Sequence, residues 1–310
     1  MEIHSELGVT VTSPSNEVPC AVLLRVGLDT DLGGVWGPIT DNRAIDEKRE
    51  FEFIPFPNWP TTRTIRSKPE SELSRFRVEL HSYDDLVGLN HSDRKLSEFL
   101  PNDYITVKED KKKKRWLNPG GIVPHNDPNF RYATSGEYWR GTERTDRSGT
   151  HGRLPVAWKT FRSGEVRANE LWLLFVERLA PFTSQSGFRT MESAQKSLNG
   201  IYLIGSMLVS EFVDIATTGW ESAIASHLQN PEPIVENFHF RRLKDEPVIT
   251  IGVPNKTRLW PTAIPLNFVI DGQRGVTETG RSLHVTEKDQ VRFKYIYDRD
   301  ILEEVLSLEP

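Results

Sequence analysis

The sequence has a single cysteine, Cys20, so no internal disulfide can form, as is usual for proteins of a reducing compartment. It also lacks any run near the ~20 consecutive apolar residues that a membrane-spanning helix needs. Glu2 and Glu6 lie near the amino end, and no basic segment followed by an apolar one marks a secretion signal. We therefore expect a cytoplasmic protein with no membrane partner.

The sequence also lacks an excess of positive charge. The 310 residues contain 39 lysines and arginines against 44 aspartates and glutamates, which gives a formal net charge of −5. Proteins that hold duplex DNA non-specifically are usually basic, so any contact with nucleic acid must be local. Several familiar catalytic signatures are also missing: a P-loop, a dinucleotide-binding fingerprint, a Gly-x-Ser-x-Gly elbow, a His-Glu-x-x-His helix and a kinase motif set.

Short apolar runs between polar stretches indicate a mixed fold. Strands are expected where these runs are fully apolar or alternate, at residues 21–28, 51–56, 171–176, 201–209, 247–252 and 291–297. Helices are expected at residues 92–100, 191–198, 220–228 and 300–306, the last with Asp300 as its cap. We therefore expect an α+β fold with a mixed or antiparallel sheet, peripheral helices and long loops.

The chain is interpreted as one domain after a flexible lead-in. Residues 1–17 are polar and rich in Ser, Thr and Glu, which is typical of a loose terminus. Residues 18–310 are long enough to bury one large core. Within them, residues 270–310 are either part of that core or a C-terminal extension.

A turn-rich loop follows the first expected strand. Its glycines allow the backbone to approach a ligand closely, and its candidate ligand contacts are Asp29, Gly33, Gly34 and Trp36. Asp29 and Asp31 either share a divalent cation or form an ordinary Asx turn. Arg25 lies inside the apolar strand and needs a partner, which is either one of these aspartates or an anion held in a cavity.

The most informative stretch lies between Pro124 and Pro128, because prolines make this polar loop rigid. His125 and Asp127 are separated by one residue, so in extended backbone both side chains point the same way. This pattern suits a general base with its orienting carboxylate, two metal ligands, or a turn held by hydrogen bonds. A single cysteine makes a zinc site of the usual kind improbable on these residues alone.

Two later segments combine aromatic and cationic side chains, at residues 237–242 and 255–261. Aromatic rings stack on bases and cations pair with phosphate, so both segments are candidates for a nucleotide or nucleic-acid contact. The alternative is a buried aromatic beside solvated cations. The candidate ligand-binding residues from these segments are His239, Arg241, Lys256 and Arg258.

The order of several segments resembles the nucleotide modification associated domain 3 family. The matching pieces are residues 24–29 with the glycines at 33, 34 and 37, then 53–57, 125–130, 171–175 and 202–205. From its genomic neighbourhood, the family was proposed to act in modified-base DNA systems of prokaryotes and their viruses. Two departures are Thr134-Ser135-Gly136 in place of Thr-Tyr-Gly, and Asn169-Glu170 in place of Gly-Asp. The strand pair at 171–176 and 201–209 also looks like the core of PUA-like β-barrels, which read unusual or flipped bases.

The resemblance implies a nucleotide- or modified-base-handling protein of a DNA modification system. In this hypothesis, the segments 25–38, 125–132 and 239–258 converge on one pocket that holds a base or nucleotide. Aromatic stacking would come from Trp36, Phe130, Tyr132 and Trp172. Phosphate would be held by Arg25 and Arg258, and an amino edge read by Asp127.

Two alternatives stay open. The first is an enzyme acting on a nucleotide or DNA base, with His125 as the acid or base, Asp127 as its orienter and a divalent cation on Asp29 and Asp31. The second is a non-catalytic interaction subunit whose partners are other proteins of the modification system. The residues do not decide between these classes.

Overall fold

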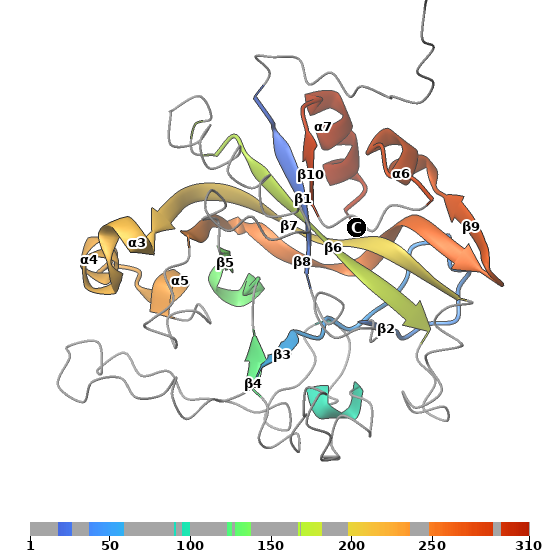
Figure 1. The fold of residues 1–310 in the computed structure, drawn as a ribbon, viewed down its shortest axis with the longest axis horizontal. Coiled ribbons are helices and arrows are strands. Elements are labelled where there is room, and N and C mark those ends of the chain that lie inside the picture. Colours follow the sequence, from blue (N-terminus) through green and yellow to red (C-terminus); the bar gives the residue numbers. More distant parts are fainter. Residues whose placement is uncertain are drawn as a thin grey trace, which may run out of the picture.

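The computed structural model describes residues 18–26, 37–58, 90, 95–99, 123–125, 128–137, 167, 169–181, 198–235, 248–287 and 293–309. Within these ranges the chain has an α+β fold built on an eight-stranded sheet, which confirms the expected class. Figure 1 shows the sheet crossing the molecule, with α6 and α7 on one side and the short β3–β4 pair on the other.

The sheet is mixed. Its order is β10-β1-β6-β7-β8-β5, and the strands are β10 (Phe293–Ile296), β1 (Ala21–Arg25), β6 (Trp172–Pro181), β7 (Leu198–Asp214), β8 (Val248–Ile270) and β5 (Thr134–Glu137). β2 (Gly37–Ile39) also pairs with β6, and β9 (Gln273–Val276) with β8. Strands β1 and β2 run parallel to β6, and the other pairings are antiparallel. Over the described residues the sheet is open, so closure into a PUA-like barrel is not confirmed.

Short helices and a second, two-stranded sheet complete the described elements. The helices are α3 (Ile215–Thr218), α4 (Trp220–Ser226), α5 (Glu232–Val235), α6 (Glu278–Ser282) and α7 (Arg299–Ser307), with 3-10 turns at Leu96–Phe99 and Phe130–Tyr132. The two-stranded sheet pairs β3 (Phe56–Asn58) with β4 (Val123–His125). Asp298, rather than the expected Asp300, caps α7 by accepting from the backbone N–H groups of residues 300 and 301.

Strands β7 and β8 are the longest elements and form one antiparallel pair that is interrupted by bulges. At the widest interruption Met207 pairs with Thr257 while Val209 pairs with Gly252, so residues 253–256 bulge out of the ladder. A bulge accommodates Pro254, which has no N–H to donate. The candidate contact segment at residues 255–261 therefore lies within β8.

Side-chain alternation gives the sheet two buried faces. On one face Leu24, Phe175 and Tyr202 belong to a cluster that also holds Phe51 and Phe53. On the other face the cluster is completed by residues from α7 and from the turn after α6, and includes Leu23, Leu174, Val176, Leu283, Leu302 and Val305. A third cluster fastens α3, α4 and α5 to the end of β7 and β8.

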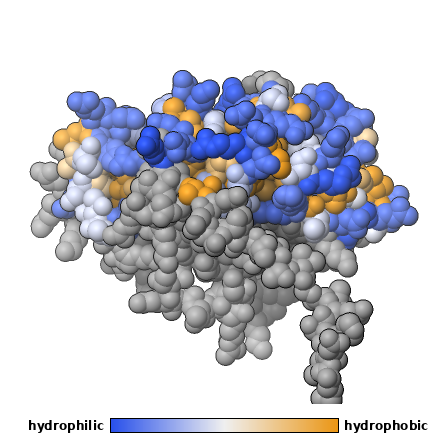
Figure 2. Space-filling view, turned by 90° about the horizontal axis from the view of Figure 1, so that it is seen from above, coloured by the Kyte–Doolittle hydropathy of each residue, from blue (hydrophilic) through white to orange (hydrophobic). Residues whose placement is uncertain are grey.

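The surface seen from the α6 and α7 side is largely hydrophilic, with hydrophobic side chains scattered singly over it (Figure 2). Among the described residues, none of the helices combines the length and apolar character needed to cross a membrane. Cys20 is buried, and burial raises the pKa of its thiol, which agrees with the interpretation of Cys20 as a small core residue.

Tyr202 supplies a test of this core, because its buried hydroxyl donates to the Ile45 carbonyl over 2.6 Å. Burial raises the pKa of this phenol well above its usual value. Tyr202→Phe leaves the Ile45 carbonyl without this donor, so we expect a loss of about 1–2 kcal/mol in the free energy of unfolding at pH 7.

The pH dependence provides a second measurement on the same variant. A raised native pKa means that the unfolded chain ionises Tyr202 first, above about pH 10, while the native state keeps it neutral. Ionisation of Tyr202 in the unfolded chain therefore lowers the free energy of unfolding of the wild type above that pH, and this effect is absent in Tyr202→Phe. In urea titrations at pH 7, 9 and 10.5, the gap between the two proteins should narrow at the highest pH; a constant gap would contradict the assignment.

Candidate functional site

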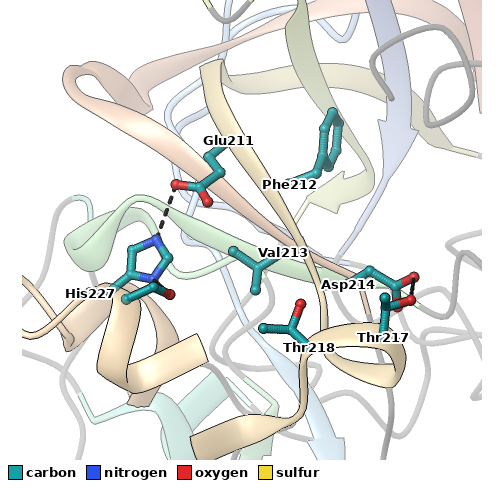
Figure 3. Close-up of a pocket in the computed structure, with 8 residues that line it drawn as sticks. Glu211, Phe212, Val213, Asp214, Thr217, Thr218 and His227 are labelled. Atoms are coloured by element: carbon teal, nitrogen blue, oxygen red, sulfur yellow. Dashed lines mark hydrogen bonds and ion pairs between the residues drawn. The ribbon is translucent and has the colours of Figure 1, made fainter. Parts of the chain in front are cut away.

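A cavity of about 240 Å³ opens where β7 ends and the helices α3 and α4 follow (Figure 3). Its lining comes from the last four residues of β7, from α3, and from the end of α4. The lining residues are Glu211, Phe212, Val213, Asp214, Thr217, Thr218, Ser226 and His227. The site therefore combines two carboxylates, an imidazole and hydroxyl groups with an apolar wall.

The local sequence explains how these groups come together. β7 ends at Asp214, and Gly219, with a positive φ of 75°, makes the sharp turn between α3 and α4. Trp220 and Ile224 then bury one face of α4 in the cluster beneath it, which confirms the helix expected at residues 220–228. This anchoring places His227, directly after α4, beside the end of β7.

The His227 ring lies within hydrogen-bond distance of three groups. Its Nδ1 lies 2.7 Å from the carbonyl oxygen of Ala223 and 3.0 Å from Oγ of Ser226, and its Nε2 lies 3.0 Å from Oε2 of Glu211. A carboxylate can only accept, so Nε2 donates to Glu211, whereas the role of Nδ1 depends on the tautomer. The bond to Glu211 ties the end of α4 to β7 across the cavity.

The hydroxyl groups also make internal hydrogen bonds. Thr217 Oγ1 donates to Asp214 Oδ2 over 2.8 Å, and Ser226 Oγ donates to the Ala223 carbonyl over 2.9 Å. The Glu211 side chain is 51% exposed, so solvent screens its pairing with His227. The pair thus fixes geometry more than it adds stability.

Strand β8 connects the end of β7 to β5 beside this cavity. Val248, the first residue of β8, pairs with Asp214 on one side and with Glu137 of β5 on the other. His239 and Arg241 lie outside the described residues.

Arg25 lies at a different part of the sheet. It pairs with Val176 of β6, which in turn pairs with Leu203 of β7. From Leu203 to Phe212 the strand advances about 30 Å at ~3.3 Å per residue. Strand alternation also puts Arg25 on the face of Leu23, which packs toward α6 and α7. The structure does not bring Arg25 and the cavity together.

Phe130 is a packing residue in the structure. Its ring lies edge-to-face against Phe53 at 5.6 Å and against Phe175 at 5.3 Å between centroids. A Cβ at Gly205 would lie 2.9 Å from the Phe130 ring, so the strand must carry glycine there for the ring to fit. Both Phe130 and Tyr132 are half-buried, but Tyr132 lies beside a cation, since the guanidinium carbon of Arg131 is 5.3 Å from its ring centroid.

The remaining described candidates gather near the end of α7. Trp172 packs against the cluster under α7, and Arg258 of β8 forms an ion pair with Glu309. Lys256 is exposed on the bulge of β8. Arg258 therefore has a carboxylate partner within the chain, and Trp172 is partly covered.

Other candidates cannot be placed. Asp29, Asp31, Gly33, Gly34, Trp36 and Asp127 lie outside the described residues, as do His239 and Arg241. For His125 the backbone pairs with Phe56 in the β3–β4 sheet. In the described part of the chain, no group of three or more His, Cys, Asp and Glu side chains is arranged to hold a metal ion.

Sequence reasoning missed the residues of the cavity itself. His227 fell within an expected helix, and a histidine in a last helical turn is a known signal for capping the free carbonyls. Its partner Glu211 is on β7, and nothing in the local sequence connects the two. Comparison with known proteins gives no further guide, because no family model, curated protein or solved structure matches the chain.

Phe130 and Tyr132 provide a matched test of packing against surface exposure. Phe130→Ala removes a ring held between two others, so we expect it to lower the free energy of unfolding by about 2–4 kcal/mol. Tyr132→Ala removes a half-buried ring, and we expect a loss nearer 1 kcal/mol. Urea titration of both variants measures the difference; equal losses would contradict the placement of Phe130 in the core.

Proposed function

We propose that the chain binds a base-bearing ligand, a nucleoside or nucleotide of unmodified or modified type, in the Glu211–His227 cavity. The observation that carries the proposal is the composition of this cavity, which sets carboxylate, imidazole and hydroxyl groups beside the apolar side chain of Val213 (Figure 3). A planar heterocycle needs both kinds of surface, because its faces are apolar and its edges form hydrogen bonds.

The size of the cavity supports a small ligand. Its volume of about 240 Å³ is below the ~300–1,000 Å³ typical of sites for drug-sized molecules. A single base or nucleoside matches this volume better than an extended strand does. This agrees with the net charge of −5, which favours a local contact over a long phosphate-binding surface.

The wider role rests on the sequence resemblance alone. The resemblance suggests a ligand from a prokaryotic or viral DNA modification system, with other proteins of that system as partners.

A catalytic role is the second candidate, and one observation favours it. The imidazole of His227 is oriented by Glu211 in an open cavity, which is the arrangement of an acid–base pair. Chromatography of wild-type protein incubated with each bound nucleoside distinguishes the two. A new product that His227→Ala fails to form would make the chain an enzyme.

The binding proposal is tested by filling the cavity. Thr218 is exposed and lines the cavity, so Thr218→Trp should block it without disturbing the core. In a thermal-shift screen of nucleosides, nucleotides and short oligonucleotides, a ligand at 100-fold its Kd stabilises by about 2.7 kcal/mol. We expect a clear rise in Tm for wild type and little or none for Thr218→Trp.

Ser222→Trp is the matched control, because Ser222 is exposed on α4 and does not line the cavity. It should respond as wild type does. If Thr218→Trp gives the same shift as wild type, the ligand binds elsewhere. If no compound shifts the wild-type Tm, the result supports the alternative that the chain is a non-catalytic interaction subunit.

A further inference from the structure

The hydrogen bonds of the cavity show which kind of group a ligand must offer. Three side-chain donors in the lining already have acceptors within the protein: His227 Nε2 on Glu211, Thr217 on Asp214, and Ser226 on Ala223. Among the described lining side chains, only the Thr218 hydroxyl is left as a donor that no such bond uses. The cavity therefore has few donors to offer a ligand.

The cavity still offers hydrogen-bond acceptors to a ligand. Glu211 accepts from His227 through Oε2, and its side chain is 51% exposed at the mouth of the site. A carboxylate has two oxygens with about four acceptor positions, so a single hydrogen bond leaves most of that capacity for a ligand. Figure 3 shows the Glu211 carboxylate beside the imidazole, on the Val213 side of the strand, with Asp214 on the other side.

The charge of the lining also favours a ligand that donates hydrogen bonds. Glu211 and Asp214 give the lining two carboxylates. The lining contains neither lysine nor arginine among its described residues. A negative cavity disfavours phosphate and carbonyl oxygens and favours N–H donors, which carry partial positive charge.

We infer that Glu211 reads an exocyclic amino group, so the cavity selects amino-bearing bases over bases with a carbonyl at the same ring position. The inference rests on the proposed function and deepens it, because it names the ligand class as cytosine-like or adenine-like. A site built to accept from a donor rejects an analogue that presents an acceptor instead, since the carboxylate is then left facing a lone pair.

Matched nucleoside pairs test this directly. Cytidine and uridine differ by an amino group against a carbonyl at one ring position, as do adenosine and inosine. Calorimetric titration of the full chain should show the amino member of at least one pair binding about tenfold or more tightly than its partner. Equal affinities within both pairs, or a preference for uridine or inosine, would overturn the inference while leaving the base-binding proposal in place.

Glu211→Gln links the selectivity to its residue. The new amide oxygen still accepts from His227, and its NH₂ group becomes a donor toward the cavity. The preference for the amino member should then fall to within about threefold or reverse. Glu221→Gln, an exposed change on α4 outside the lining, should keep the wild-type preference. An unchanged preference in Glu211→Gln overturns the assignment to Glu211. Failure of all four nucleosides to bind wild type overturns the inference, whereas the proposed function falls only if the wider thermal-shift screen also gives no ligand.

Discussion

The antiparallel pairing of β7 with β8 is the constraint on which the other described elements depend. Strand β6 pairs along β7, while β5 and β9 pair with opposite ends of β8. Both core clusters contain residues from these long strands, so each face of the sheet is organised by the same ladder. Strands of this length twist strongly, and bulges allow the pairing to continue as they bend. A change that broke the ladder would therefore separate the cavity from the core.

Because this ladder is long, it also keeps two regions of the molecule apart: the region around Arg25 and the Glu211–His227 cavity. Arg25 is connected to the middle of β7 through β6, whereas the Glu211–His227 cavity lies at the strand's end. A guanidinium at the first position cannot neutralise a phosphate at the second, because the screening length at physiological salt is only about 8 Å. If both regions bind ligands, they do so as separate sites.

Sequence reasoning found the strands that are buried on both faces. The apolar runs now seen in β1, β6 and β7 carry a continuous hydrophobic signal, because neither face meets water. It failed for β8, where Pro254, Asn255 and Lys256 resemble a loop and are in fact carried by a bulge within the strand. Phe130 was interpreted as a ligand contact because its polar neighbours mark a loop, whereas only tertiary contacts with Phe53 and Phe175 reveal its packing.

The cavity could not be predicted, because it depends on one contact between residues 211 and 227 that no local pattern specifies. Its acidity has a further consequence for a nucleotide. Phosphates near Glu211 and Asp214 would be repelled, and the repulsion would be strongest at low salt. A nucleoside or an extruded base can occupy the acidic cavity only if its sugar points outward and any phosphate lies beyond the carboxylates. Under the proposed function, the carboxylates of the cavity thus constrain the orientation of a bound base as well as its class.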